Sequence, residues 1–137
     1  MQPHDLLGTL LKQVSRSFYL TLKVLPHPVR QPIGLAYLFA RAADTIADAA
    51  LISRAERLKH LTLFREAFRD GEVGRLRAIK DALCGADRNV SERELLSRLD
   101  EGFALLRALD PADQSLVRDL ILTLTEGMVM DLATFPG

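Results

Sequence analysis

Residues 37–48 read Tyr37-Leu38-Phe39-Ala40-Arg41-Ala42-Ala43-Asp44-Thr45-Ile46-Ala47-Asp48. The polar residues Tyr37, Arg41, Asp44 and Asp48 follow one another at intervals of four, three and four positions. At about 100° per residue of an α-helix, this spacing places all four side chains within an arc of roughly 60°. The other positions are apolar apart from Thr45, as in a helix buried inside a bundle. The segment therefore predicts a buried helix that carries one polar stripe.

The rest of the chain also shows helical periodicity and lacks the β-branched clusters that are typical of strands. We therefore predict an all-α fold. After an apolar helical pattern over residues 6–14, the expected helices cover residues 17–24, 29–50, 53–69, 72–83, 91–106 and 110–134. No repeat or low-complexity linker divides the sequence, so we expect no internal domain boundary within residues 1–137.

Local signals mark the expected helix ends. Proline and glycine break or end helices, and serine followed three residues later by glutamate forms a capping box. The signals are, in chain order, Pro26 with Pro28, Pro32 in the first turn of its helix, Ser53 with Glu56, Asp70-Gly71, Ser91 with Glu94, and Pro111 at the first position of the last helix.

Composition excludes several classes of function. Basic and acidic residues balance at 18 each, so nothing favours a nucleic-acid partner. The single cysteine, Cys84, excludes an internal disulfide and, with three histidines, leaves no Cys/His zinc site. No apolar run approaches the roughly 18 residues of a membrane span, and the first residues do not resemble a signal peptide. We expect a cytoplasmic protein without a transmembrane segment.

The polar stripe can hold a metal ion. Two carboxylates, a guanidinium and a phenol in an apolar helix must pair, bind a metal or line a wet cavity, because an unpaired buried charge is strongly destabilising. Asp44 and Asp48 lie one turn apart and can both reach Mg²⁺, which prefers oxygen ligands. Arg41 can contact a phosphate. The alternatives are an internal salt bridge between Arg41 and Asp44, or a solvated helix face.

Two further segments are candidates for the same site. Ser15-Arg16-Ser17-Phe18 brings two hydroxyls and a guanidinium to a helix N-terminus, which favours anions such as a diphosphate. In the segment over residues 126–131, Gly127 permits close backbone approach and Asp131 can face the cavity. The alternatives are an ordinary helix start for the first segment, and a packing glycine beside a surface aspartate for the second.

In order and spacing, these three segments resemble the squalene and phytoene synthase family. The resemblance implies an isoprenoid synthase helical bundle around a central cavity, of which this chain holds the N-terminal half. The pattern Tyr-Leu-x-x-Arg-Ala-x-Asp-Thr-Ile is more similar to squalene synthases than to phytoene synthases. The implied catalytic residues are Tyr37, Arg41, Asp44 and Asp48, with both aspartates as Mg²⁺ ligands, and the implied substrate-binding residues are Ser15, Arg16, Ser17, Phe18, Tyr37 and Arg41.

The resemblance also implies a transferase. Its reaction would be the Mg²⁺-dependent head-to-head condensation of two farnesyl or longer prenyl diphosphates to presqualene diphosphate, followed by reduction to squalene with NADPH. The alternatives are a phytoene synthase, a hopanoid-pathway relative, or a non-catalytic member that acts as a helical assembly or interaction protein. An apolar product further implies a peripheral contact with a membrane.

Two departures from the family pattern bear on activity. Ala47 stands where many squalene synthases carry an acidic residue, so the metal would depend on two carboxylates of this helix. The family's second aspartate-rich motif and catalytic tyrosine are not found after Asp131. We therefore expect a truncated domain that is inactive by itself. We also expect the stripe to face one concave surface, with Arg16 within about 20 Å of Asp44, roughly two helix diameters.

Overall fold

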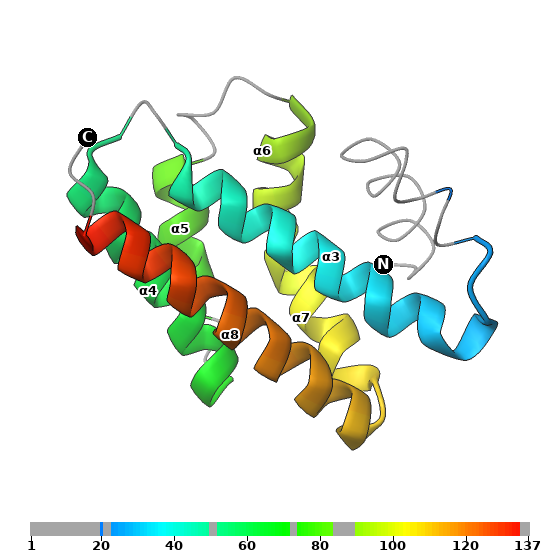
Figure 1. The fold of residues 1–137 in the computed structure, drawn as a ribbon. Helices are drawn as coiled ribbons and strands as arrows, with labels where there is room; N and C mark the ends of the chain where they lie inside the picture. Colours follow the sequence, from blue (N-terminus) through cyan, green and yellow to red (C-terminus); the bar gives the residue numbers. More distant parts are fainter. Residues whose placement is uncertain (1–19, 21–22, 50–51, 72–73, 84–89, 135–137) are drawn as a thin grey trace.

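The computed structural model describes residues 20, 23–49, 52–71, 74–83 and 90–134, and over these residues it contains helices and no strand (Figure 1). The predicted all-α fold is confirmed. None of the described helices is long and apolar enough to cross a membrane. The helices are α3 (His27–Ala47), α4 (Arg54–Asp70), α5 (Arg75–Leu83), α6 (Val90–Ser97), α7 (Leu99–Ala108) and α8 (Pro111–Thr134).

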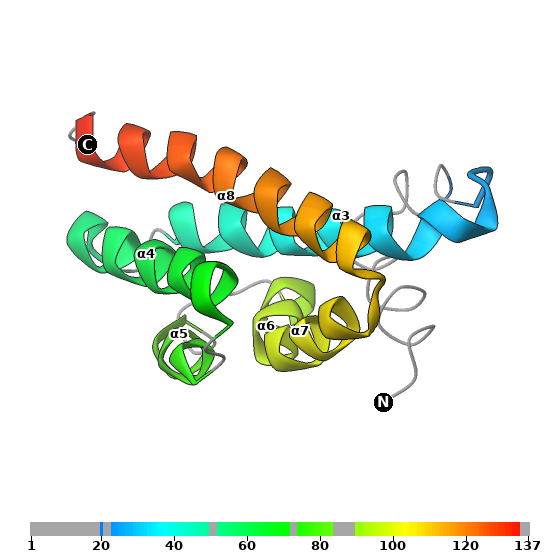
Figure 2. The same cartoon turned by 90° about the horizontal axis from the view of Figure 1, so that it is seen from below.

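Helix α3 occupies the centre of the arrangement. It contacts α4, α6, α7 and α8. Seen from below, α8 lies on one side of the molecule and α5, α6 and α7 lie on the other, with α3 and α4 between them (Figure 2). Helices α3 and α8 pack side by side and run in the same general direction. The long apolar helix predicted from the sequence is therefore the element around which the others assemble.

A cluster of four phenylalanines ties α3 to α4 and α7. The Phe39 ring of α3 is 1% exposed, and its centroid lies 4.7 Å from that of Phe68 and 5.1 Å from that of Phe103, both in edge-to-face geometry. Phe64 adds a third edge contact at 6.5 Å. Gly102 of α7 makes this approach feasible, because a Cβ there would lie 3.1 Å from Phe39 Cε1. The four rings contribute packing beyond the burial of their area.

Several predicted helix ends are confirmed. The Ser53 hydroxyl accepts a hydrogen bond of 3.1 Å from the Glu56 amide at the start of α4. Gly71 ends that helix with a φ of 74°, the left-handed conformation that glycine adopts without strain. Pro111 is the first residue of α8.

Helix α3 differs from its predicted bounds of 29–50 at both ends. It begins at His27, so Pro32 lies beyond the first turn, and it ends at Ala47. Asp48 is therefore the C-cap residue, with φ −101° and ψ 8°, and not an interior helical position. No glycine or proline follows Ala47 to mark this end, and so the sequence pattern placed the end too late.

The helix predicted over residues 91–106 is two helices, α6 and α7, separated at Arg98. The Ser97 hydroxyl donates to the Glu94 carbonyl at 2.8 Å, and the Arg98 amide donates to the Leu95 carbonyl, three residues back. Such bonds tighten the turn and compete with the regular α-helical pattern. Helix α6 begins at Val90, one residue before the predicted start at Ser91; the side chain of Ser91 lies outside the described part of the chain, so the predicted capping box stays a prediction.

Three other predicted helical segments lie partly or wholly outside the described residues. Residues 6–14 lie outside the described part of the chain, as do residues 72–73. The helix predicted over residues 72–83 starts too early, because Gly74 forms a turn and α5 begins at Arg75. Of the helix predicted over residues 17–24, Leu20 is helical, whereas Lys23 and Val24 form a turn. This predicted helix therefore extends too far, because the turn precedes Pro26.

We expect Phe39→Ala to lower the free energy of unfolding by about 3–5 kcal/mol, because it removes a fully packed aromatic ring and leaves a cavity. Urea denaturation followed by circular dichroism measures the change. The control is Val24→Ala at a side chain that is 81% exposed, where the expected change is within about 0.5 kcal/mol. Equal effects of the two substitutions would contradict the central role of the phenylalanine cluster.

Candidate active site

The predicted polar stripe lies along α3 on the side away from the phenylalanine cluster. Tyr37, Arg41 and Asp44 are half-buried, and Asp48 is exposed. The Asp48 amide donates to the Asp44 carbonyl at 2.9 Å, so the helical spacing continues through the C-cap although α3 ends one residue earlier. The carboxylates of Asp44 and Asp48 therefore remain one turn apart on the same side of the helix.

The charged groups of the stripe influence one another. Burial raises the pKa of Asp44 above its ordinary value, the neighbouring Asp48 carboxylate raises it further, and the Arg41 guanidinium opposes both effects. A bound cation would relieve the repulsion between these two carboxylates. The alternative of a solvated helix face describes Asp48, but it does not describe Asp44, Arg41 or Tyr37.

Thr45, the remaining polar residue of the segment, has a structural role. Its side chain is buried, and its hydroxyl donates to the Arg41 carbonyl at 3.0 Å. This bond satisfies the hydroxyl within its own helix. Thr45 therefore needs no partner from a ligand.

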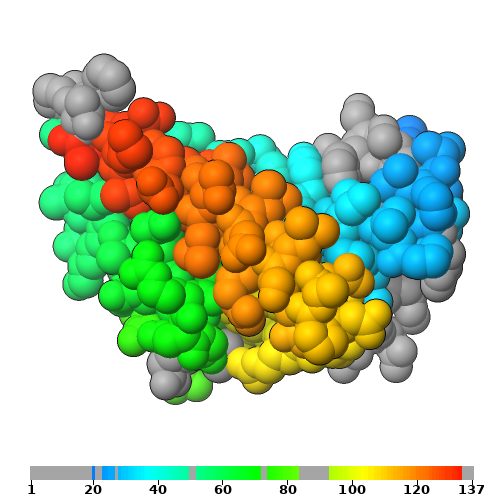
Figure 3. Space-filling model, turned by 60° about the horizontal axis from the view of Figure 1, so that its bottom comes forward, coloured from blue at the N-terminus to red at the C-terminus, as the bar shows by residue number. Residues whose placement is uncertain are grey.

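A second row of residues lies on α8, which packs beside α3. Leu116, Leu120 and Leu124 are 64%, 53% and 40% exposed. With Gly127 and Asp131, which are also exposed, they recur at helical spacing within an arc of about 80°. We call these five residues the leucine row. Figure 3 shows α8 uncovered along its length on one face of the molecule, with α3 beside it.

The sequence reasoning singled out Gly127 and Asp131 but missed the leucines of this row. A Cβ at Gly127 would meet no described atom within 4 Å, so Gly127 does not serve to pack two described helices together. The missed signal was the spacing of four between Leu116, Leu120 and Leu124. It was hidden because α8 is rich in apolar residues on all sides.

The described oxygen ligands on the stripe are the carboxylates of Asp44 and Asp48. Within the described ranges, no three His, Cys, Asp or Glu side chains cluster closely enough to hold a metal ion. Mg²⁺ in phosphate-transferring sites is usually held by one or two protein carboxylates together with substrate phosphates and water. The mutually repelling pair Asp44 and Asp48 fits that requirement.

Two expectations remain predictions. Ser15, Arg16, Ser17 and Phe18 lie outside the described residues, so their approach to the stripe is not tested. The expected concave surface in front of Asp44 is not tested either.

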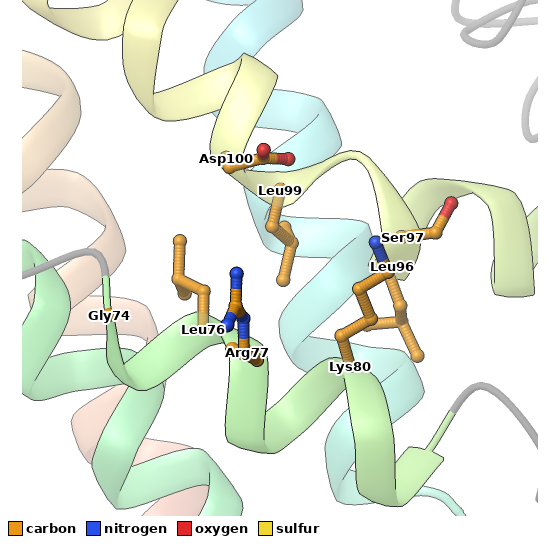
Figure 4. Close-up of a pocket in the computed structure, with 8 residues that line it drawn as sticks. All are labelled: Gly74, Leu76, Arg77, Lys80, Leu96, Ser97, Leu99 and Asp100. Carbon is orange, nitrogen blue, oxygen red and sulfur yellow. The ribbon is translucent and has the colours of Figure 1, made fainter.

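A separate surface pocket of about 360 Å³ lies between α5 and the junction of α6 with α7 (Figure 4). Its lining includes two cationic side chains, one carboxylate and three leucines. None of its lining residues comes from α3 or α8, so it is distinct from the polar stripe and the leucine row. The lining residues are Gly74, Leu76, Arg77, Lys80, Leu96, Ser97, Leu99 and Asp100.

Comparison with known proteins assigns the family. Residues 11–136 match the family model for squalene/phytoene synthase. The chain belongs to the squalene/phytoene synthase family. The expectation from the motifs is therefore confirmed, and the half-buried stripe of α3 is the segment that carried it.

The chain is similar both to squalene synthases and to proteins that contain a phytoene synthase. The Botryococcus squalene synthase of Botryococcus braunii is 30% identical over 119 residues, which cover 87% of this chain and 23% of the relative. A bifunctional lycopene cyclase/phytoene synthase of Blakeslea trispora is 41% identical over 61 residues, which cover 44% of this chain and 10% of the relative. The chain thus spans less than a quarter of each of these two relatives.

A solved structure supports the fold. The complex of TcSQS with the ligand E5700 superposes with a TM-score of 0.76 at 28% sequence identity, covering 96% of this chain and 36% of TcSQS. The isoprenoid synthase fold that the sequence implied is therefore confirmed.

We expect Asp44→Asn to stabilise the metal-free chain at neutral pH. The pKa of Asp44 is higher in the folded than in the unfolded chain, so stability is lost as the pH rises through the folded pKa and the carboxylate ionises. The stabilisation should disappear at about pH 3, where the acid is largely protonated in both states. Thermal unfolding of the variant and the parent chain at both pH values measures the effect.

The matched control is Asp119→Asn, at an exposed position of α8 outside the leucine row. It removes the same formal charge without relieving the carboxylate pair. An Asp44→Asn chain that is less stable than its parent at neutral pH would show that the Asp44 carboxylate is favourably paired in the absence of metal.

Proposed function

We propose that this chain forms part of a prenyltransferase that condenses two prenyl diphosphates head to head. The observation that carries the proposal is the pair of neighbouring carboxylates on α3, one of them half-buried, with Arg41 on the same stripe. A solvent-facing helix does not need this arrangement, whereas a diphosphate-binding site does. A non-catalytic assembly protein would have no need to retain these acids.

In this proposal, each residue of the stripe has a chemical task. Asp44 and Asp48 would hold Mg²⁺, which would stabilise the charge on the departing diphosphate. Arg41 lies on the same stripe, where its guanidinium can donate to diphosphate oxygens in bidentate geometry. Tyr37, one turn before Arg41, would line the pocket and limit the access of water.

The leucine row suits the other part of such a substrate. A prenyl diphosphate has a charged head and a long apolar tail, so its site needs both kinds of surface close together. Helices α3 and α8 pack side by side, and Leu116, Leu120 and Leu124 are exposed. We propose that the tail lies along these leucines and that the rest of a family-length bundle covers it from the other side.

We propose squalene as the product, formed from two farnesyl diphosphates through presqualene diphosphate with reduction by NADPH. The squalene synthases of Botryococcus match over 87% of this chain. Phytoene synthesis is the second candidate, favoured by the higher identity of 41% to the Blakeslea trispora protein over a shorter segment. The apolar product also leads us to propose a cytoplasmic enzyme in peripheral contact with a membrane.

We expect the 137-residue chain by itself not to condense farnesyl diphosphate. Two diphosphates carry several negative charges, and ionisation of one requires neutralisation from both sides of a cavity. The described residues offer a carboxylate pair on one side. Incubation with farnesyl diphosphate, Mg²⁺ and NADPH, followed by analysis for presqualene diphosphate and squalene, tests this expectation. Robust turnover by the chain alone would refute it.

Within a bundle of family length, we expect Asp44→Ala or Asp48→Asn to lower kcat/KM by about 100- to 1,000-fold, the usual loss for one group that stabilises transition-state charge. The same assay with and without Mg²⁺ measures the effect. Asp119→Asn on α8 is the control and should leave turnover unchanged. Full activity of either stripe variant would remove these carboxylates from the site.

A further inference from the structure

Helix α4 carries none of the candidate site residues, yet one of its side chains reaches the end of the helix that does. The Arg57 Nη1 group donates to the Ala47 carbonyl at 3.2 Å, in a part-buried contact. Ala47 is the last residue of α3, and Asp48 directly follows it. Arg57 therefore binds the backbone immediately beside one of the two carboxylates.

Among the described residues, no backbone amide donates to this carbonyl, which is the last of α3. The last four carbonyls of an α-helix have no intrahelical donor, and the end of the helix dipole there favours a cation. Beyond Ala47, Asp48 donates from its amide to the Asp44 and Ile46 carbonyls. An unsupported terminal turn frays readily. Arg57 supplies a hydrogen-bond donor and a positive charge at this helix end.

The start of α4 holds Arg57 in place. The Ser53 hydroxyl caps the helix, and the Arg57 amide donates to the Ser53 carbonyl at 2.9 Å. The Nε atom of Arg57 is buried and has no hydrogen-bond partner among the described residues. The Nη1 contact with Ala47 is itself part-buried, so water would replace this bond only in part.

We propose that Arg57 is a positioning residue that holds the end of α3, so that the Asp48 carboxylate stays beside that of Asp44. The proposal rests on the proposed function, in which these two carboxylates bind Mg²⁺. Arg57 acts through the backbone: the charges that shift the pKa of Asp44 belong to Asp48 and Arg41, and not to Arg57. Residues that orient the ligands of a metal ion commonly have a strong effect on metal affinity when they are substituted.

Hydrogen exchange tests, without any metal, whether Arg57 stabilises the end of α3. In Arg57→Gln, the Asp48 amide should exchange about tenfold faster, which corresponds to the loss of one charge-assisted hydrogen bond, while the Phe64 amide in the middle of α4 should be unaffected. Arg57→Lys should restore most of the protection. Lys59→Gln, which removes an exposed cation of the same helix, is the control. An unchanged Asp48 amide in Arg57→Gln overturns the proposal.

Metal binding tests the consequence for the carboxylates. Mn²⁺ is titrated into each chain with inorganic diphosphate present, and free Mn²⁺ is followed by electron paramagnetic resonance. Arg57→Gln should weaken Mn²⁺ binding about tenfold, with partial rescue in Arg57→Lys and no change in Lys59→Gln. Equal affinity of Arg57→Gln and the parent chain overturns the positioning role, even if the variant is less stable.

Hydrogen exchange and Mn²⁺ binding together distinguish a failure of the proposed function from a failure of the role of Arg57. If the parent chain and Asp44→Asn bind Mn²⁺ equally weakly, the proposed function fails for this chain, and the positioning of a metal site fails with it. The exchange rate of the Asp48 amide still shows whether Arg57 stabilises the end of α3. If the parent chain binds Mn²⁺ and Arg57→Gln does not affect it, only the role of Arg57 fails.

Discussion

The packing of Phe39 against the rings of α4 and α7 is the interaction on which the rest of the structure depends. It joins three helices at one buried point, where Gly102 leaves room for the ring. Because the apolar face of α3 is used in this way, its polar stripe must lie on the opposite side. The orientation of the candidate site is thus a consequence of core packing.

The position of the stripe carries an energetic cost for the protein without metal. Asp44 is half-buried beside a second carboxylate, and both conditions disfavour its charge. A structure selected only for stability would replace one of these acids. Their presence on a helix whose other residues serve the core is typical of a functional site.

Helix α4 contacts both α3, which carries the polar stripe, and α8, which carries the leucine row. Arg57 donates to the end of α3, and Arg65 donates to the Thr125 hydroxyl at 3.0 Å and to the Leu122 carbonyl at 3.2 Å, both on α8. Neither arginine belongs to a family motif identified in the sequence. These arginines add polar contacts from α4 to the direct packing of α3, which carries the stripe, against α8, which carries the leucine row.

The sequence by itself determined the all-α class, the polar stripe and its identity as a family motif, because these depend on local spacing along a helix. The end of α3 at Ala47 and the break at Arg98 are not marked in the sequence pattern; in the structure a side-chain hydrogen bond lies at each of them. Only the tertiary structure decided which face of α8 is buried. Thr125 is fully buried while Leu120 is 53% exposed, the reverse of their hydropathy, because Arg65 of α4 gives the threonine hydroxyl a partner and the described residues leave the leucine uncovered.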